Sequence, residues 1–128
     1  MGKHMTAISA GESQIMEALW SGGPLTMEEL TAKVGPPNGW ETSTVRTLVF
    51  RLQKKKALES FREEGRYLYR PLIERAAYVQ TESQGLLDRL FGGRLTPMVN
   101  HFAEHGSLTA DEVEQLKALV EKLEKKHD

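Results

Sequence analysis

Hydroxyl and guanidinium side chains recur at helical spacing between Trp40 and Lys56. Apolar residues at i, i+3, i+4 and i+7 form one stripe of this stretch: Val45, Leu48, Val49 and Leu52. The opposite face and its flanks carry mostly polar and basic residues: Ser43, Thr44, Arg46, Thr47, Phe50, Arg51 and Lys54. Arginine forms bidentate hydrogen bonds with guanine in the DNA major groove, and serine and threonine hydroxyls bond to bases or phosphates. The pattern therefore predicts a helix over residues 42–56, capped by Thr42 or Ser43, whose outer face fits duplex DNA.

The same stretch has a simpler interpretation, in which a basic amphipathic helix packs on its own domain and keeps its charges in water. The charge distribution favours the first interpretation, although the whole chain carries a net charge of only −1. From Glu41 to Arg70, eight Lys and Arg residues stand against four Asp and Glu, which gives +4. From His101 to Asp128, four stand against seven, which gives −3. A basic middle and an acidic end indicate that only one segment faces phosphates.

A second string with chemical potential is His101-Phe102-Ala103-Glu104-His105, which spells the H-x-x-E-H pattern of some zinc peptidases. Two histidines at i and i+4 on a helix can hold zinc, but a hydrolase also needs a third protein ligand and a substrate cleft. The sequence offers no convincing third ligand, no Ser/His/Asp or Cys/His set and no phosphate-binding glycine loop. We therefore predict no catalytic residue, no metal site and no cofactor, with the two histidines on an ordinary helix surface.

Composition restricts the class of protein further. The chain has 128 residues, 39% hydrophobic and 27% charged, and no cysteine, which excludes disulfides and thiolate metal sites. No apolar run reaches the length of a membrane span, and no signal-peptide pattern opens the chain. These features predict a soluble cytoplasmic protein that does not bind membranes. Residues 1–7 are interpreted as a disordered lead or tag remnant.

The order of elements up to Pro71 predicts the architecture of the first domain. Capping boxes at Ser9–Glu12 and Thr26–Glu29 begin two helices, and the second is expected to stop at the Gly35–Gly39 turn. After the third helix, residues 58–63 and 66–70 alternate with period two around Glu64-Gly65, which predicts a hairpin. Three helices and a hairpin form a winged helix-turn-helix, with the third helix in the major groove. Arg62 and Arg66 would flank the hairpin tip and contact phosphate or the minor groove, or form a solvated charge lattice with neighbouring acids.

Beyond Pro71 the pattern is wholly helical, and a third capping box lies at Thr109–Glu112. This part carries more apolar surface than its length can bury alone. Two copies that pack into one core would solve the problem, and a symmetric dimer would place two DNA-binding heads on one duplex. The predicted dimerisation residues are Leu86, Leu87, Leu90, Phe91, Val99, Phe102, Leu116, Leu119, Val120 and Leu123.

Several motifs in register make the sequence resemble the BlaI/MecI penicillinase-repressor family from Ile8 to about Lys126. The sharpest match is Thr44-Val45-Arg46-Thr47-Leu48, then Arg51-Leu52 and Lys54-Lys55. Further matches follow in order: Glu12, Met16, Leu19-Trp20, Tyr67, Tyr69, Gly92-Gly93, Leu108-Thr109, Asp111-Glu112 and Leu116. The resemblance implies that Thr44, Arg46 and Thr47 read or line the groove, that Arg51 and Lys54 contact the DNA backbone, and that residues after Pro71 dimerise.

The chain also departs from the family pattern. Glu41-Thr42-Ser43 stands where relatives often have Ser-Pro-Lys, so one basic contact is missing. Phe50 replaces a small polar residue, and it is expected either to meet a thymine methyl group or to lean on the wing. The resemblance adds an inactivating protease or sensor to the expected partners, and relatives are cut at an Asn-Phe pair. This chain has His101-Phe102 there, with Asn100 one place earlier.

The sequence thus predicts a mainly α-helical protein with a small β-hairpin wing. Residues 8–71 would form a winged-helix DNA-binding domain and residues 72–128 a helical dimerisation domain. The expected function is a dimeric, sequence-specific transcriptional repressor that binds a palindromic operator in double-stranded DNA. The alternative is a winged-helix module that binds protein, with the charge asymmetry serving that interface. A steep fall of affinity with salt would distinguish DNA binding from this alternative.

Overall fold

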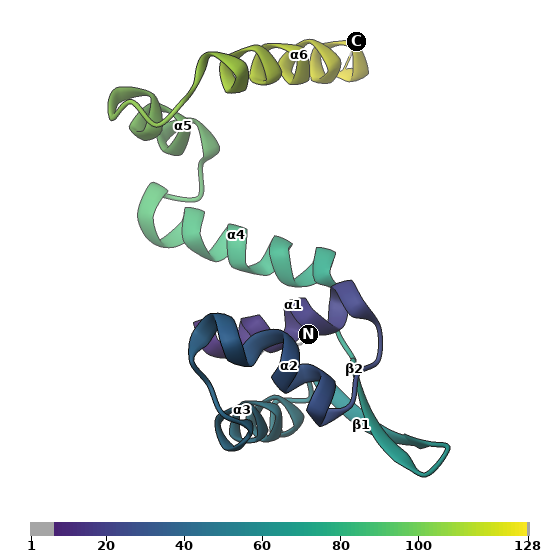
Figure 1. The fold of residues 1–128 in the computed structure, drawn as a ribbon. Coiled ribbons are helices and arrows are strands. Elements are labelled where there is room, and N and C mark those ends of the chain that lie inside the picture. The colour runs from purple at the N-terminus through teal and green to yellow at the C-terminus, as the bar shows by residue number, and fades with distance from the viewer. Residues whose placement is uncertain (1–6, 128) are drawn as a thin grey trace. The chain divides into compact units, whose positions relative to one another are not determined.

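The computed structural model describes residues 7–127 and contains mostly helices with one hairpin (Figure 1). The elements in chain order are α1 (Ala10–Gly22), α2 (Met27–Asn38), α3 (Thr42–Lys54), β1 (Leu58–Glu63), β2 (Arg66–Pro71), α4 (Arg75–Phe91), α5 (Leu95–Glu104) and α6 (Ala110–His127). This confirms the predicted fold class. The chain divides into two compact units, an N-terminal unit that ends at Thr81 and a C-terminal unit that begins at Glu82. The predicted lead of residues 1–7 lies outside the described residues, apart from Ala7.

The three predicted capping boxes are confirmed. The Ser9 hydroxyl accepts from the Glu12 amide at 3.1 Å, while the Glu12 carboxylate accepts from the Ser9 amide at 2.9 Å. Thr26 with Glu29, and Thr109 with Glu112, form the same reciprocal pair. Each box satisfies helix N–H groups that have no partner within the helix, so the short local pattern determines where α1, α2 and α6 begin.

The Gly35–Gly39 stretch, where α2 was expected to stop, is helical through Pro36 and Pro37 as far as Asn38, so the helix ends inside this stretch. The prolines remove two amide donors, but only in the last turn, where the helix is about to end. Gly39 then adopts a left-handed conformation (φ 69°), and the Trp40 amide donates to the Gly35 carbonyl at 2.9 Å. A Cβ on Gly35 would lie 2.8 Å from the Trp40 carbonyl oxygen, so this close approach requires glycine.

Two expectations for α3 also need correction. The predicted cap by Thr42 or Ser43 is wrong, since Glu41 is the N-cap residue and its side chain makes no capping hydrogen bond. The helix ends at Lys54 rather than Lys56, because Lys56 already has a positive φ of 62° and the Ala57 amide donates to the Leu52 carbonyl. This turn directs the chain from α3 into β1.

Helices α1, α2 and α3 enclose the core of the N-terminal unit. Its fully buried side chains come from all three helices and from the start of β1: Ile15, Met16, Leu19, Leu30, Val45, Val49, Leu52 and Leu58. The predicted apolar stripe of α3 is therefore the face that packs inward. Burying each such side chain contributes about 1.5–3 kcal/mol, which holds α3 in one orientation.

The hairpin pairs β1 and β2 antiparallel, from Leu58 opposite Pro71 to Glu63 opposite Arg66. Glu64 (φ 53°) and Gly65 (φ 78°) both adopt left-handed conformations, as a type I′ turn requires, so the predicted tight turn is confirmed. A single bridge between Leu25 and Tyr69 adds a short third partner that the sequence did not predict. The tip of the hairpin projects beyond the helices of the N-terminal unit (Figure 1).

The first turn of α4 and the residue Ile73 before it contact α1 within the N-terminal unit. The Trp20 indole N–H donates to the Ile73 carbonyl at 3.0 Å, and its ring lies 5.4 Å from the Tyr78 ring. Arg75 forms an ion pair with Glu17 at 3.0 Å. Ile73 itself packs against the core. The compact part of this unit thus extends beyond the hairpin into α4.

The C-terminal unit has a different character, because none of the described residues of α5, α6 and the part of α4 after Thr81 is buried. Large apolar side chains are exposed on each helix, among them Leu90 on α4, Phe102 on α5 and Leu119 on α6. Across residues 7–127, no helix combines the length and the apolar character that a membrane span requires.

Candidate nucleic-acid interface

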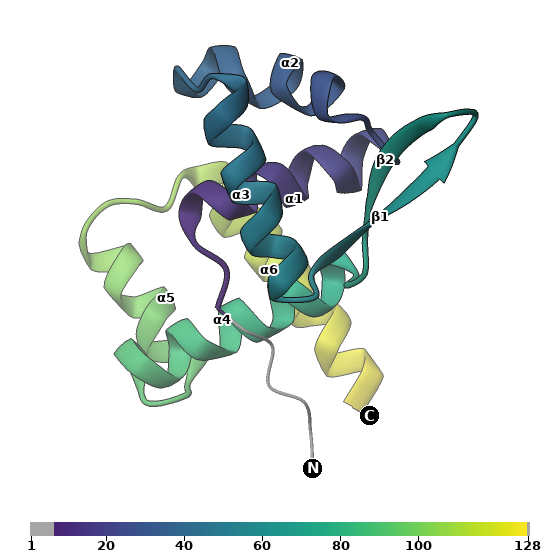
Figure 2. The same cartoon turned by 90° about the horizontal axis from the view of Figure 1, so that it is seen from below.

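The outer face of α3 is open to solvent in the N-terminal unit. All seven candidate side chains that the sequence assigned to this face and its flanks are exposed: Ser43, Thr44, Arg46, Thr47, Phe50, Arg51 and Lys54. Figure 2 shows α3 running beside the base of the hairpin. Because the inner stripe is buried in the core, the structure fixes which face of α3 a partner can reach.

A surface cavity of about 230 Å³ joins the start of α3 to the hairpin. Its lining comes from three elements and the residue before α2: Thr26, Met27, Glu28, Thr42, Arg46, Arg66 and Tyr67. Sequence reasoning gave Arg46 and Arg66 separate roles, but the fold brings both cations to one site. It missed Thr26, Thr42 and Tyr67, because their proximity depends on how α2 and β2 pack rather than on any local pattern.

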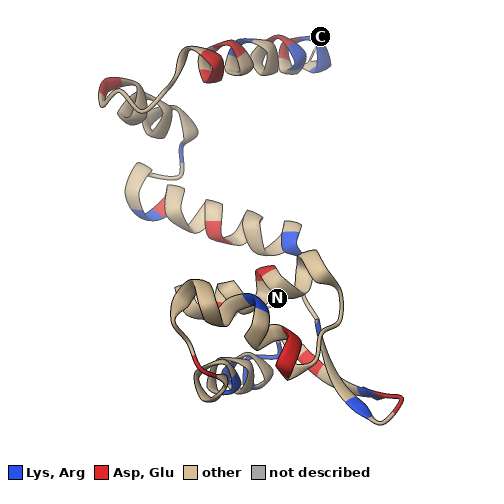
Figure 3. Ribbon diagram, viewed as in Figure 1, with Lys and Arg blue, Asp and Glu red and all other residues tan. Residues whose placement is uncertain are grey.

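One of the three arginines of the hairpin forms an ion pair, and the other two lie near its tip. Arg70 forms an ion pair with Glu59 at 2.7 Å and lies over the Phe61 ring at 4.3 Å. Arg62 lies 5.6 Å from the centroid of the Tyr67 ring, its cross-strand neighbour. Arg62 and Arg66 are both exposed. Figure 3 shows basic segments on α3 and on both strands near the turn, with the acidic turn between the strands.

Two contacts within α3 alter what its outer face offers. The Thr47 hydroxyl donates to the Ser43 carbonyl at 3.0 Å, so its proton is used inside the helix. The Lys54 ammonium group lies 5.3 Å from the centroid of the Phe50 ring, one turn earlier. A cation held near an aromatic face gains about 0.5–1 kcal/mol at an exposed site. The face therefore combines exposed cations with an exposed aromatic ring.

Lys55 is a basic residue of this segment that does not lie on the open face. Its ammonium group forms an ion pair with Glu12 at 2.5 Å and donates to the Ala7 carbonyl at 2.8 Å. Burial by itself raises the pKa of Glu12, but the hydrogen bonds from Lys55 and the Ser9 amide outweigh it, so this pKa lies below its ordinary value. The pair ties the end of α3 to the start of α1, and sequence reasoning missed it because 43 residues separate the partners.

The two histidines of the H-x-x-E-H string lie on or just after α5. His105 Nδ1 is 2.8 Å from the His101 carbonyl oxygen, and the two rings are 4.4 Å apart. The Phe91 and Phe102 rings flank His101 at 6.1 and 5.3 Å. Within residues 7–127, no group of three or more His, Cys, Asp or Glu side chains is placed to hold a metal ion. The arrangement is an aromatic cluster on a helix surface.

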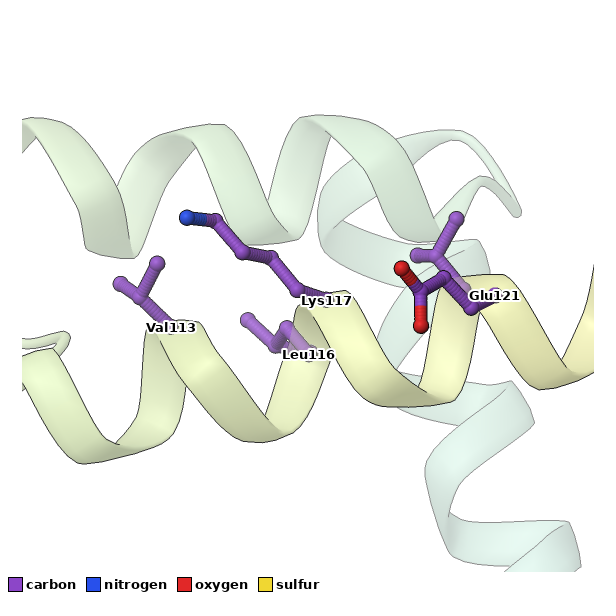
Figure 4. Close-up of a pocket in the computed structure, with 5 residues that line it drawn as sticks. Val113, Leu116, Lys117 and Glu121 are labelled. Carbon is purple, nitrogen blue, oxygen red and sulfur yellow. The ribbon is translucent and has the colours of Figure 1, made fainter.

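The predicted dimerisation residues remain accessible within the C-terminal unit. Leu86, Leu90, Phe102, Leu119, Val120 and Leu123 are exposed, and Leu87, Phe91, Val99 and Leu116 are half-buried. Along α6, Val113, Leu116, Lys117, Val120 and Glu121 line an open depression of about 410 Å³ (Figure 4). One helix alone supplies this lining, so the depression is a helix face rather than an enclosed cavity.

Known proteins resemble this chain over most of its length. The model of the penicillinase repressor family matches residues 8–122. The penicillinase repressor of Bacillus licheniformis is 29% identical over 119 residues, which is 93% of each chain. The penicillinase repressor of Staphylococcus aureus is 25% identical over 126 residues, covering 98% of this chain and all of that one.

Solved structures of other proteins have a fold similar to that of this chain. The solution structure of monomeric Bacillus licheniformis BlaI in complex with the blaP half-operator is 27% identical, has a TM-score of 0.54, and covers 60% of this chain and 94% of that one. A MarR family protein from Bacillus stearothermophilus covers 94% of this chain and 75% of its own, at 20% identity and a TM-score of 0.52, which supports the fold alone. The family match spans nearly the whole described chain, and the chain therefore belongs to the penicillinase repressor family.

Proposed function

We propose that this protein is a dimeric transcriptional repressor that binds a palindromic operator in double-stranded DNA. The observation that carries the proposal is the orientation of α3. Its apolar stripe is buried in the core of the N-terminal unit, and its basic, hydroxyl-bearing face is exposed beside the hairpin. A helix of this kind, held by a rigid scaffold, is the element that winged-helix proteins place in the major groove.

The assignment of roles follows from position on this surface. Arg46, near the start of α3, is the candidate for a bidentate guanine contact, and Thr44, Thr47 and Ser43 line the groove. Arg51 and Lys54 lie further along the helix and contact phosphates, as do Arg62 and Arg66 at the hairpin tip. The relative from Bacillus licheniformis, whose solution structure contains a half-operator, supports DNA as the partner.

The dimer is proposed because the C-terminal unit lacks a core of its own. Exposed apolar side chains cover α4, α5 and α6, while no described residue of these helices is buried. A second copy would bury this surface and present two N-terminal units to one duplex, so the preferred site would be a palindrome.

Selection from a random-sequence duplex library with the full-length protein tests the proposal. We expect enrichment of one palindromic sequence, with binding that weakens steeply as salt rises, because Lys and Arg release counterions from phosphates. Arg51→Ala with Lys54→Ala should lower the salt slope by about one per lost contact. Lys122→Ala with Lys125→Ala changes the charge equally on α6 and should leave the slope unchanged. A library without enrichment would contradict the proposal.

The rival function is a winged-helix module that binds a protein through the same basic surface. That module would also prefer an anionic partner, but it would not select one base sequence. The exposed, hydroxyl-rich face of α3 favours DNA, since Ser and Thr hydroxyls pair with base edges and phosphates. The same selection therefore decides between the two functions. We propose no enzymatic activity, and we propose a cytoplasmic location because the protein would act on DNA.

Relief of repression is the remaining part of the proposal. The family resemblance suggests an inactivating protease or sensor, and His101-Phe102 occupies the position of the family's cleavage site. These residues are exposed on α5, but they lie inside a helix. Proteolysis acts on chain segments that open locally, so cleavage here would require α5 to unwind.

A further inference from the structure

The outer face of α3 contains an apolar contact between its basic side chains. Ser43, Thr47, Phe50 and Lys54 follow one another at intervals of four, three and four residues, so they form one row along the exposed side of the helix. Phe50 is 58% exposed and does not pack against the hydrophobic core. A single exposed aromatic ring is common on protein surfaces, but one placed among the cations of a proposed binding face is a candidate contact for an apolar group of the partner.

Thr47 strengthens the apolar character of this row. Its hydroxyl donates to the Ser43 carbonyl at 3.0 Å, which leaves its methyl group and its oxygen lone pairs for a partner. Thr47 precedes Phe50 by three residues, so the two side chains are neighbours on the helix surface. Together they provide a methyl group and an aromatic ring within a row that ends in a lysine.

The surrounding charges indicate what covers this patch. Arg46, Arg51 and Lys54 are exposed around Phe50, and the Lys54 ammonium group lies 5.3 Å from the centroid of the ring. A partner that complements this patch is anionic and presents a small apolar group between its charges. Duplex DNA meets both conditions, because the C5-methyl group of thymine lies in the major groove between the phosphate backbones.

We propose that Phe50, together with the methyl group of Thr47, is a specificity-determining contact for the C5-methyl group of one thymine in each operator half-site. This inference rests on the proposed function and adds the identity of one base to it. It also separates two kinds of readout on α3. Arg46 reads hydrogen-bonding groups near the start of the helix, and Phe50 reads a methyl group one turn later.

Replacing thymine by uracil tests this directly, because uracil lacks the methyl group and keeps every hydrogen-bonding group of the base. In the selected operator duplex, each symmetric thymine pair is replaced in turn, and affinity for the full-length protein is measured at fixed salt. We expect one position at which uracil weakens binding by about fourfold per half-site, the factor for burying one methylene-sized group. Phe50→Ala should remove most of that difference, and Thr47→Ser should reduce it less.

Two further variants serve as controls for effects on folding. Phe50→Leu keeps an apolar side chain and should retain a preference for thymine at the same position. Gln53→Ala changes a half-buried residue of α3 outside the row and should leave the preference unchanged. Equal binding of thymine and uracil operators at every position would overturn the inference, as would a preference that is undiminished in Phe50→Ala. Either result would leave operator selection intact, whereas failure to select any operator would contradict the proposed function itself.

Discussion

The N-terminal and C-terminal units treat their apolar side chains in opposite ways. In the N-terminal unit, Ile15, Leu30 and Leu52 are completely buried among three helices and a hairpin. In the C-terminal unit, the helices leave Leu90, Phe102 and Leu119 between 41% and 59% exposed. A small unit that buries its apolar surface folds as a closed structure, whereas one that exposes it requires another surface. This difference supports the proposal that the first unit binds DNA and the second associates with another copy of the chain.

The largest expected effect comes from charging the apolar face of α6. Leu116→Asp with Leu119→Asp would bury two carboxylates in the proposed dimer, and loss of the dimer would separate the two DNA-binding heads. Linked heads gain about 10²–10⁴-fold in affinity over separate ones, so binding to the palindrome should fall by that factor. Fluorescence anisotropy with the operator duplex measures it.

The matched control for that variant is Ala110→Asp with Ala118→Asp, which adds the same charge to exposed positions of the same helix that are not three or four residues from Leu116 or Leu119. We expect this control to remain dimeric and to bind the operator like the unchanged protein. Equal losses in both variants would mean that charge on α6, rather than its apolar face, determines affinity.

The next effect concerns stability of the N-terminal unit and its dependence on pH. The pKa of Glu12 lies below its ordinary value of 4.5, so the ionised carboxylate stabilises the fold above that pH. The contribution is lost as pH falls through the lowered pKa. Glu12→Gln should cost about 1.5–3 kcal/mol at neutral pH, the range for hydrogen bonds to charged groups, and the cost should shrink below pH 4.5. Urea unfolding at several pH values measures the difference.

Glu17→Gln is the control for this prediction, since Glu17 pairs with Arg75 at the surface. Exposed pairs contribute about 0–1 kcal/mol, so this variant should change stability little. A pH-independent cost in Glu12→Gln would show that the carboxylate charge does not stabilise the unit.

Arg46 and Lys54 are expected to make different kinds of contact on the proposed DNA-binding surface. Arg46→Ala should cost about 1–3 kcal/mol per head and relax specificity at one base pair, because it removes a bidentate base contact. Lys54→Ala should weaken specific and random DNA alike, because a phosphate carries no sequence information. Competition against single-base operator variants separates the two roles. A uniform loss across all variants for Arg46→Ala would make Arg46 a phosphate contact.

The smallest effect locates the boundary between the units. A fragment that ends at Pro71 lacks the Trp20 hydrogen bond to Ile73 and the contact between the Trp20 and Tyr78 rings. A fragment that ends at Thr81 keeps both. One hydrogen bond and one aromatic pair together contribute about 1–3 kcal/mol, so the longer fragment should be more stable by that amount. Equal unfolding midpoints would place the boundary at the hairpin.

The parts of the fold that the sequence predicted are those that local patterns determine. Capping boxes mark where α1, α2 and α6 begin, the Val45–Leu52 stripe identifies the buried face of α3, and Glu64-Gly65 specifies the hairpin turn. The exact end of α2 within the Gly35–Gly39 stretch could not be predicted this way. Its two prolines indicate a break, but the Trp40–Gly35 hydrogen bond and the left-handed Gly39 let the helix include them.

The unpredicted parts of the candidate site are contacts between residues distant in sequence. Lys55 pairs with Glu12 across 43 residues, and Arg46 reaches the same cavity as Arg66. Spacing along one helix predicted which side chains are exposed on α3, because that property depends on helical period. It could not predict that Lys55 would pair with Glu12 instead of lying on the open face, since that depends on tertiary packing.

Sedimentation equilibrium of the unaltered protein at micromolar concentration tests most directly whether the C-terminal unit is completed by a second copy. We expect a particle of twice the chain mass of 14.4 kDa without DNA, and a particle of that mass plus one duplex with operator DNA. A single species of 14.4 kDa at these concentrations would contradict it, because the exposed apolar faces of α4, α5 and α6 would then have no partner of their own kind.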